Sequence, residues 1–336
     1  MKVSGKKWVI GLVLAVLVYA GIAFVSDVQQ LRRHLVEYRW WTFFGALLLA
    51  SGNYLFRFAK WEYYLRRLGI GSNAPGEPFR PLPFGESLVI YLSGFVMSIT
   101  PGKAGEVFKS VLLASARGVP MARSAPIVVA DRLTDLLSLI VLVAIGSAHF
   151  PGYGWIAWTA TAMVGAVLFF IVFEGLTLRM IDLMGSFGPG RALAPRLREA
   201  YCALRVMTTP LALCWATVIS VLAWALECTA LWLILRGLHA PVALPIAFFT
   251  YATATIAGAI AMLPGGLGGT EFTMQQMLRA LGGTGSAAAG AATLLVRIAT
   301  LWFAVVVGLV ALAVFRRRYD RNAGTVTRRS ETAVAA

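Results

Sequence analysis

Long uninterrupted apolar stretches dominate the pattern of hydrophobic and polar positions along this chain. A helix needs about 20 apolar residues to cross a hydrocarbon layer of about 30 Å. Stretches of this kind lie at residues 8–26, 41–61, 127–150, 153–173, 211–235 and 287–315. The pattern therefore predicts an all-α integral membrane protein with about six transmembrane helices. The first stretch exceeds the apolar region of about 7–15 residues in a secretory signal, so we interpret it as a span that stays in the protein.

Two further apolar stretches are each interrupted by a segment rich in proline and glycine. The arms of the first are residues 86–100 and 107–117, and those of the second are residues 245–263 and 272–281. At 1.5 Å per residue, the arm 86–100 reaches only about 22 Å, too short to cross the membrane. We therefore expect two re-entrant helical hairpins, although the arm 245–263 could also cross alone. The residues expected to break the helices or act as hinges are Pro101, Gly102, Gly105, Pro264, Gly265, Gly266 and Gly268.

The two interrupted regions resemble each other in sequence. Glu106 precedes Arg132 by 26 residues, and Glu271 precedes Arg297 by the same 26 residues. Three predicted spans, at residues 127–150, 153–173 and 211–235, lie between the first interrupted segment and the second. The two units, residues 84–150 and 245–315, would therefore lie inverted relative to each other in the membrane. Inverted repeats with broken helices are typical of secondary transporters. The alternative is a chance similarity among membrane helices rich in glycine and alanine.

The composition strengthens the prediction of a membrane protein. The chain has 336 residues, of which 59% are hydrophobic and 13% charged, against about 25% charged residues in soluble domains. The formal net charge is +15, and the positive residues stand in short clusters beside apolar stretches. This placement is typical of cytoplasmic loops facing anionic lipid and does not favour nucleic-acid binding.

The distribution of positive residues also predicts an orientation. The basic segments 57–80 and 176–209 are expected inside, with both termini cytoplasmic and residues 316–336 forming a basic, disordered tail. Residues 1–315 would form a single membrane domain in a bacterial-type inner (plasma) membrane. One segment disagrees: residues 27–39 would lie outside although they carry Arg32, Arg33 and Arg39. Apolar residues at helical spacing suggest that this segment is an amphipathic helix lying on the membrane surface.

Ionisable residues within the predicted membrane segments are the candidate functional groups. Each such charge costs about 2.5–3.5 kcal/mol on insertion scales, so a group of them suggests a polar cavity. Arginine binds phosphate through two parallel hydrogen bonds, and the helix ends after each break would add donors for an anion. The predicted substrate-binding residues are Arg132, Arg297, Glu106, Glu271, Lys103, Asp131 and Asp135.

The same charged residues could instead have purely structural roles. Glu106 and Glu271 could receive a cationic headgroup or a coupling proton, or they could simply neutralise the arginines. Asp131, Arg132 and Asp135 could form a buried ion-pair cluster, and the solitary Glu227 could be structural. The three cysteines and three histidines show no spacing typical of a metal or catalytic site. We expect no metal, no cofactor and no catalytic residue.

Several motifs together resemble a known family. They are Asn53-Tyr54-Leu55-Phe56-Arg57 with Lys60-Trp61, Pro101-Gly102-Lys103-Ala104-Gly105-Glu106, Asp131-Arg132-Leu133-Thr134-Asp135-Leu136, and Pro264-Gly265-Gly266-Leu267-Gly268-Gly269-Thr270-Glu271. In this order they resemble the membrane half of lysylphosphatidylglycerol synthases and its stand-alone, flippase-like relatives. The resemblance covers roughly residues 41–315. It implies that the membrane half moves aminoacylated phosphatidylglycerol between leaflets, while a separate soluble domain makes that lipid.

The sequence and the resemblance together favour a lipid transporter. The chain ends about twenty residues after the last predicted span, so synthesis of the lipid by this chain is not expected. The expected cargo is a phosphate-bearing lipid, either aminoacylated or polyprenyl-linked. The alternatives are a membrane enzyme that transfers a glycosyl or aminoacyl group, or an accessory subunit in lipid synthesis. Membrane lipids are the expected partners, with a lipid-synthesising enzyme or a second copy of the chain as further candidates.

Overall fold

The computed structural model describes residues 28–70, 82–100, 104–147, 173–186 and 194–334, with isolated positions between 152 and 169. The predicted span at residues 8–26 lies outside the described residues, and so does most of that at 153–173. Pro101, Gly102 and Lys103 also lie outside them. Every regular element of the described chain is helical, which confirms the all-α prediction.

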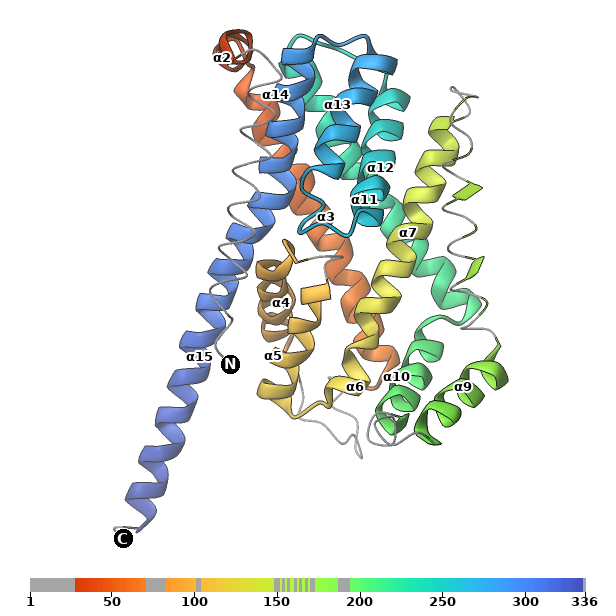
Figure 1. Ribbon diagram of the computed structural model, residues 1–336. Coiled ribbons are helices and arrows are strands. Elements are labelled where there is room, and N and C mark those ends of the chain that lie inside the picture. The colour runs from red at the N-terminus through yellow and green to blue at the C-terminus, as the bar shows by residue number, and fades with distance from the viewer. Residues whose placement is uncertain are drawn as a thin grey trace.

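The helices pack as a bundle whose two interrupted segments approach its middle from opposite ends (Figure 1). Two described helical stretches, Pro210–Gly237 and Ser286–Arg318, are long and apolar enough to cross a membrane. The α-helices are α2 (Val28–Val36), α3 (Trp40–Arg67), α4 (Phe84–Ser93), α5 (Phe108–Arg117), α6 (Met121–Ser124), α7 (Pro126–Ser147), α9 (Glu174–Ser186), α10 (Ala194–Met207), α11 (Pro210–Gly237), α12 (Leu244–Ile260), α13 (Gly269–Gly282), α14 (Ser286–Arg297) and α15 (Phe303–Val334). Three shorter helical turns are η1 (Gly94–Met97), η2 (Ala104–Val107) and the π-helical η5 (Ile298–Trp302).

The first interrupted segment consists of α4, η1, η2 and α5. Helix α4 tightens into the η1 turn, and the chain resumes at η2 after the residues that are not described. Across this gap the Gly105 N–H donates to Thr100 Oγ1 at 2.8 Å. A Cβ on Gly105 would lie 2.6 Å from both Thr100 Oγ1 and Thr100 Cγ2, so the close approach needs glycine. Close packing against Thr100 therefore explains why a glycine stands at position 105 of this break.

The second interrupted segment consists of α12 and α13, which pack against each other. Gly265, Gly266 and Gly268 all have positive φ, at 63°, 68° and 90°. A side chain is disfavoured in this region of backbone space, which explains why the break is rich in glycine. The Gly268 N–H donates to Glu271 Oε2 at 2.7 Å, which satisfies one free amide at the start of α13.

The two breaks lie against each other. A Cβ on Gly265 would be only 3.5 Å from Ile99 Cα. Ile99 also forms a small buried cluster with Leu267, Leu301 and Val305. The two resembling units therefore meet through their interruptions, as expected for a site at a repeat interface.

Helix α3 crosses the centre of the bundle against α11, with which it shares its most extensive contact. The sequence placed Arg57 and Lys60 both at the end of the predicted span 41–61 and in the basic segment 57–80 expected inside; the structure shows that they belong to a helix and not to a loop. Helix α3 continues to Arg67, and both side chains are buried. They are tolerated there because the carboxylates of Asp131 and Asp135 on α7 face them, and a buried charge needs a paired partner.

Helices α14, η5 and α15 follow one another as one long rod at one side of the bundle (Figure 1), and most residues of α14 are buried. Gly308 of α15 packs so closely on η1 that an added Cβ would be 2.5 Å from the Val96 amide nitrogen. Helix α15 continues beyond Phe315 to Val334, through the basic segment for which the sequence predicts disorder. Extending an existing helix needs no new nucleus, which favours such a continuation.

Candidate functional site

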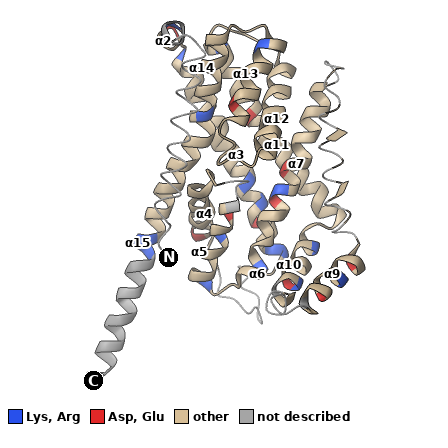
Figure 2. Cartoon of the chain, viewed as in Figure 1, with Lys and Arg blue, Asp and Glu red and all other residues tan. Residues whose placement is uncertain are grey.

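A cavity of about 540 Å³ lies where the two interrupted segments meet. Its walls come from α3, α7, α11, α12, both breaks and the η5 region. Charged residues gather in the interior of the bundle between α3, α5 and α7, and near α13 and α14 (Figure 2). The charged residues that line the cavity are Arg57, Glu106, Arg132, Asp135, Glu227 and Arg297. Apolar side chains of α7 and α12 form much of the remaining wall, so the cavity has polar and apolar parts.

Arg132 of α7 pairs with Glu106 of the first break. Its Nη2 donates to Glu106 Oε2 at 2.7 Å, and the Lys109 Nζ lies 3.2 Å from the same oxygen. The Arg132 side chain is 27% exposed, and its Nε has no hydrogen-bond partner among the described residues. That Nε is buried, and Nη2 and Nη1 also lie 3.6 Å from Asp131 Oδ2 and 3.5 Å from Asp135 Oδ2. Arg132 therefore meets the cavity through the exposed part of its side chain.

Beneath Arg132, α3 and α7 are joined by a compact ion-pair cluster. The Lys60 Nζ lies 2.6 Å from Asp131 Oδ1 and 3.0 Å from Asp135 Oδ1, and it also donates to Ser220 Oγ at 2.6 Å. Arg57 pairs with both aspartates as well. The two carboxylates, one helical turn apart, would repel each other without these cations. The cluster thus fixes α3 to α7, and two of its members, Arg57 and Asp135, form part of the cavity wall.

Arg297 of α14 closes the second break. Its Nε donates to Glu271 Oε1 at 2.6 Å, and its Nη2 donates to the carbonyl oxygen of Gly265 at 2.6 Å. Only 9% of the Arg297 side chain is exposed. Arg297 therefore holds the glycine-rich loop in place, whereas its counterpart Arg132 is more open to the cavity.

The start of η5, directly after Arg297, is tied to α3. The Tyr54 hydroxyl donates to the carbonyl oxygen of Thr300 at 3.1 Å. A π-helical turn disturbs the regular pairing of backbone carbonyls, and such turns are frequent at functional sites. Tyr54 and Arg57, neighbours on one face of α3, thus connect the second repeat unit with the ion-pair cluster of the first.

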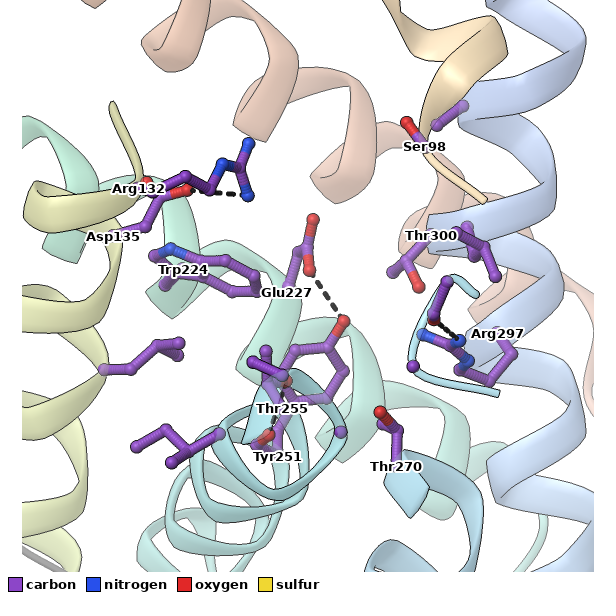
Figure 3. Close-up of a pocket in the computed structure, with 18 of the residues that line it drawn as sticks. Ser98, Arg132, Asp135, Trp224, Glu227, Tyr251, Thr255, Thr270, Arg297 and Thr300 are labelled. Carbon is purple, nitrogen blue, oxygen red and sulfur yellow. Dashed lines mark hydrogen bonds and ion pairs between the residues drawn. The ribbon is translucent and has the colours of Figure 1, made fainter. Parts of the chain in front are cut away.

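Glu227 of α11 lines the same cavity as Arg132 of α7. The Tyr251 hydroxyl donates to Glu227 Oε2 at 2.6 Å. Figure 3 shows Arg132 and Glu227 reaching from different helices into the same space, with Trp224 and Tyr251 beside the carboxylate. The sequence offered no reason to connect Glu227 with the Pro-Gly breaks, because α11 lies outside both repeat units.

The cavity continues to an apolar mouth. Ile260, Met262 and Leu263 line the cavity, and all three are exposed large hydrophobic residues. Helices α7 and α12 are tightly packed at their other end, where a Cβ on Gly146 would lie 2.6 Å from Phe249 Cβ. The polar interior is therefore continuous with an exposed apolar surface at the end of α12.

Six of the seven predicted binding residues can be placed. Glu106 and Arg132 meet, Glu271 and Arg297 meet, and the spacing of 26 residues is what brings each pair together. Asp131 and Asp135 contact Arg57 and Lys60, which the sequence placed both in the predicted span 41–61 and in the basic segment 57–80. Lys103 lies outside the described residues, and the binding role of all seven stays a prediction. No group of three or more potential metal ligands was found where the structure describes the chain.

Comparison with known proteins places the chain in a family. The family described as "Lysylphosphatidylglycerol synthase TM region" matches residues 8–308. The chain is similar to a UPF0104 membrane protein of Methanocaldococcus jannaschii, with 21% identity over 79% of this chain and 82% of that protein. It is also similar to a UPF0104 membrane protein of Methanothermobacter thermautotrophicus, with 25% identity over 66% of this chain and 72% of that protein. The chain is therefore a membrane protein that belongs to the family of the lysylphosphatidylglycerol synthase transmembrane region.

Proposed function

We propose that this protein moves a phosphate-bearing lipid between the leaflets of the membrane. The headgroup enters the cavity between the two breaks, and its phosphate binds Arg132. The observation that carries the proposal is the partly exposed Arg132 side chain on the wall of a cavity with both charged and apolar surfaces. Arginine hydrogen bonds to charged groups contribute about 1.5–3 kcal/mol each, enough to hold a phosphate there.

The lipid tails leave the cavity through the apolar mouth at the end of α12. Ile260, Met262 and Leu263 would face acyl or polyprenyl chains while the headgroup stays among the charges. An amphipathic occupant fits this division of the walls better than a small polar metabolite. Membership of a family named for a lipid synthase supports the same class of cargo.

The proposed topology has six spans and two re-entrant hairpins in an inner membrane, with both termini cytoplasmic. The pair α12 and α13 lies at one end of the bundle and the pair α4 and α5 at the other (Figure 1). This arrangement agrees with two hairpins that enter from opposite sides and meet at the cavity. Irregular backbone at such depth is tolerated because protein or a water-filled cavity covers it.

Reconstitution tests the proposal. The purified protein is placed in liposomes that contain a phospholipid with a fluorescent acyl label, and an impermeant reductant reports how much label reaches the outer leaflet. Arg132→Ala is expected to lower the rate tenfold to a hundredfold, since it removes one charged contact of about 1.5–3 kcal/mol. Arg66→Ala, which removes an exposed arginine of α3, is the matched control and should leave the rate unchanged.

Three results would count against the proposal. Wild-type protein that transfers no phospholipid above empty liposomes would contradict transport itself. Equal rates for Arg132→Ala and Arg66→Ala would contradict the anchor. A new lipid product formed from a labelled donor would favour the membrane enzyme instead.

A further inference from the structure

Among the described residues that line the cavity, one charged side chain takes part in no ion pair. Arg57, Glu106, Arg132, Asp135 and Arg297 each lie within ion-pair distance of an opposite charge. Across the part of the chain that the structure describes, Glu227 makes no such contact, and its hydrogen bond comes from a neutral phenol. The carboxylate is therefore available to a cation that comes from outside the protein.

Burial makes the ionised form of this unpaired carboxylate unfavourable in free energy. Glu227 is only 8% exposed, and an ionised carboxylate in a medium of low polarity costs several kcal/mol unless it is paired. Tyr251 satisfies only one of its two oxygens. In Figure 3 the other oxygen points into the cavity, toward the side where Arg132 lies. A ligand with a positive group would remove this cost on binding.

The surroundings of Glu227 fit an organic ammonium better than a metal ion. The cavity wall also carries the aromatic rings of Tyr54, Trp224 and Tyr251. Trp224 and Tyr251 lie next to each other, with ring centroids 6.4 Å apart. The Arg57 guanidinium already lies over the Trp224 ring, 5.6 Å from its centroid. Tyr251, which is hydrogen-bonded to Glu227, is therefore the ring that a ligand cation would meet. Aromatic faces attract alkylammonium groups within about 6 Å, whereas a metal ion needs several oxygen ligands. A carboxylate beside aromatic rings is thus suited to a headgroup amine.

We infer that Glu227 binds the ammonium group of a lipid whose phosphate binds Arg132. The inference rests on the proposed function and specifies the transported lipid as one with a zwitterionic headgroup. Arg132 of α7 would bind its negative phosphate and Glu227 of α11 its positive ammonium group. Tyr54 of α3 and Tyr251 of α12 interact with Glu227, and Arg57 of α3 and Arg297 of α14 line the same cavity. Both arginines already have carboxylate partners, so neither replaces the missing cation.

Binding in detergent tests the inference without requiring transport. The melting midpoint of the purified protein is measured with phosphatidylethanolamine or phosphatidylglycerol of the same acyl chains. The wild type is expected to bind the ethanolamine lipid at least tenfold more tightly. Glu227→Gln keeps the hydrogen bond from Tyr251 but loses the charge, so the two affinities should become equal. Glu174→Gln, which neutralises a half-exposed carboxylate on α9, is the matched control and should retain the preference.

The outcomes separate this inference from the proposed function. The inference is overturned if the wild type binds the two lipids equally well. It is also overturned if the Glu227→Gln variant keeps the preference for the ethanolamine lipid, even if lipids are transferred. A Glu227→Gln variant that changes only the pH dependence of transfer also overturns it, because Glu227 would then bind a proton. If the preference is present and depends on Glu227 but no lipid crosses the bilayer, the inference stands and the transport proposal fails.

Discussion

Arg297 and Glu271 are joined by a 2.6 Å hydrogen bond from Nε to Oε1 across 26 residues of chain. The same spacing joins Arg132 to Glu106 in the first unit, at 2.7 Å. The two pairs nevertheless differ in exposure: 27% of the Arg132 side chain is exposed against 9% of Arg297. One repeated pattern therefore gives one arginine that holds a loop and another that stays open to a ligand.

Arg297→Ala should destabilise the protein more than Arg132→Ala. Removing Arg297 leaves Glu271 buried without its cation and frees the Gly265 carbonyl. Breaking a buried ion pair in this way costs about 3–5 kcal/mol. The loss for Arg132→Ala should be smaller, because its guanidinium is partly exposed. Denaturant unfolding in detergent micelles measures both, and an equal loss for the two variants would contradict the difference in role.

The sequence predicted the relationship between these pairs because it is local to each unit. A Pro-Gly break, a glutamate and an arginine 26 residues later occur twice in the chain. The sequence left open whether each glutamate binds a ligand or neutralises the arginine, and the structure shows each glutamate bound to its arginine. The glycines of the second break were also identifiable, since three of them adopt positive φ. The glycine positions and the Glu–Arg spacing depend on backbone geometry and on distances within one unit, and both can be predicted from the amino-acid sequence.

The remainder of the site depends on contacts between distant segments. Arg57 and Lys60 fall in the basic segment expected inside because positive charges usually follow a span, and only the position of α7 shows that Asp131 and Asp135 face them. Glu227 was visible as a solitary charge, but nothing in its own segment places Tyr251 beside it. Contacts of this sort arise from helix packing between segments far apart in the chain, which a single sequence does not specify.

Lys60→Met tests whether the aspartates of α7 have a structural role. Lys60 is fully buried and contacts both Asp131 and Asp135, so its removal should cost about 3–5 kcal/mol of unfolding free energy. Combining Lys60→Met with Asp131→Asn should restore part of the loss, because the unpaired carboxylate is removed too. Unfolding measurements on the single and double variants give the coupling energy.

An exposed pair provides the control for that experiment. Arg198 and Asp182 lie 3.7 Å apart with more than half of each side chain exposed. Exposed pairs of this type contribute about 0–1 kcal/mol, so Arg198→Met should change the unfolding free energy little. A coupling energy for Lys60 and Asp131 no larger than that of the exposed pair would contradict a structural cluster.

Gly146→Ala should separate α7 from α12. The added Cβ would meet Phe249 Cβ at 2.6 Å and Phe249 Cα at 3.2 Å, and backbone does not move aside easily. Overpacking of this kind costs about 1–3 kcal/mol. Gly85→Ala on α4, where nothing lies within 4 Å of the added atom, should be neutral or slightly stabilising. Thermal unfolding of the two variants checks the contrast, and equal midpoints would show that the helices adjust without strain.

Ile260→Trp should slow lipid transfer by narrowing the apolar mouth. Ile260 is 58% exposed and lines the cavity, so a larger side chain there would meet the tail of a lipid whose headgroup lies among the charges. Leu222→Trp is the matched control, because Leu222 is also exposed and apolar but does not line the cavity. The liposome assay should show a rate several-fold lower for the first variant and unchanged for the second, with similar melting midpoints. If both variants transfer lipid at the wild-type rate, the tails leave the cavity elsewhere, and the opening beside α12 is not their path.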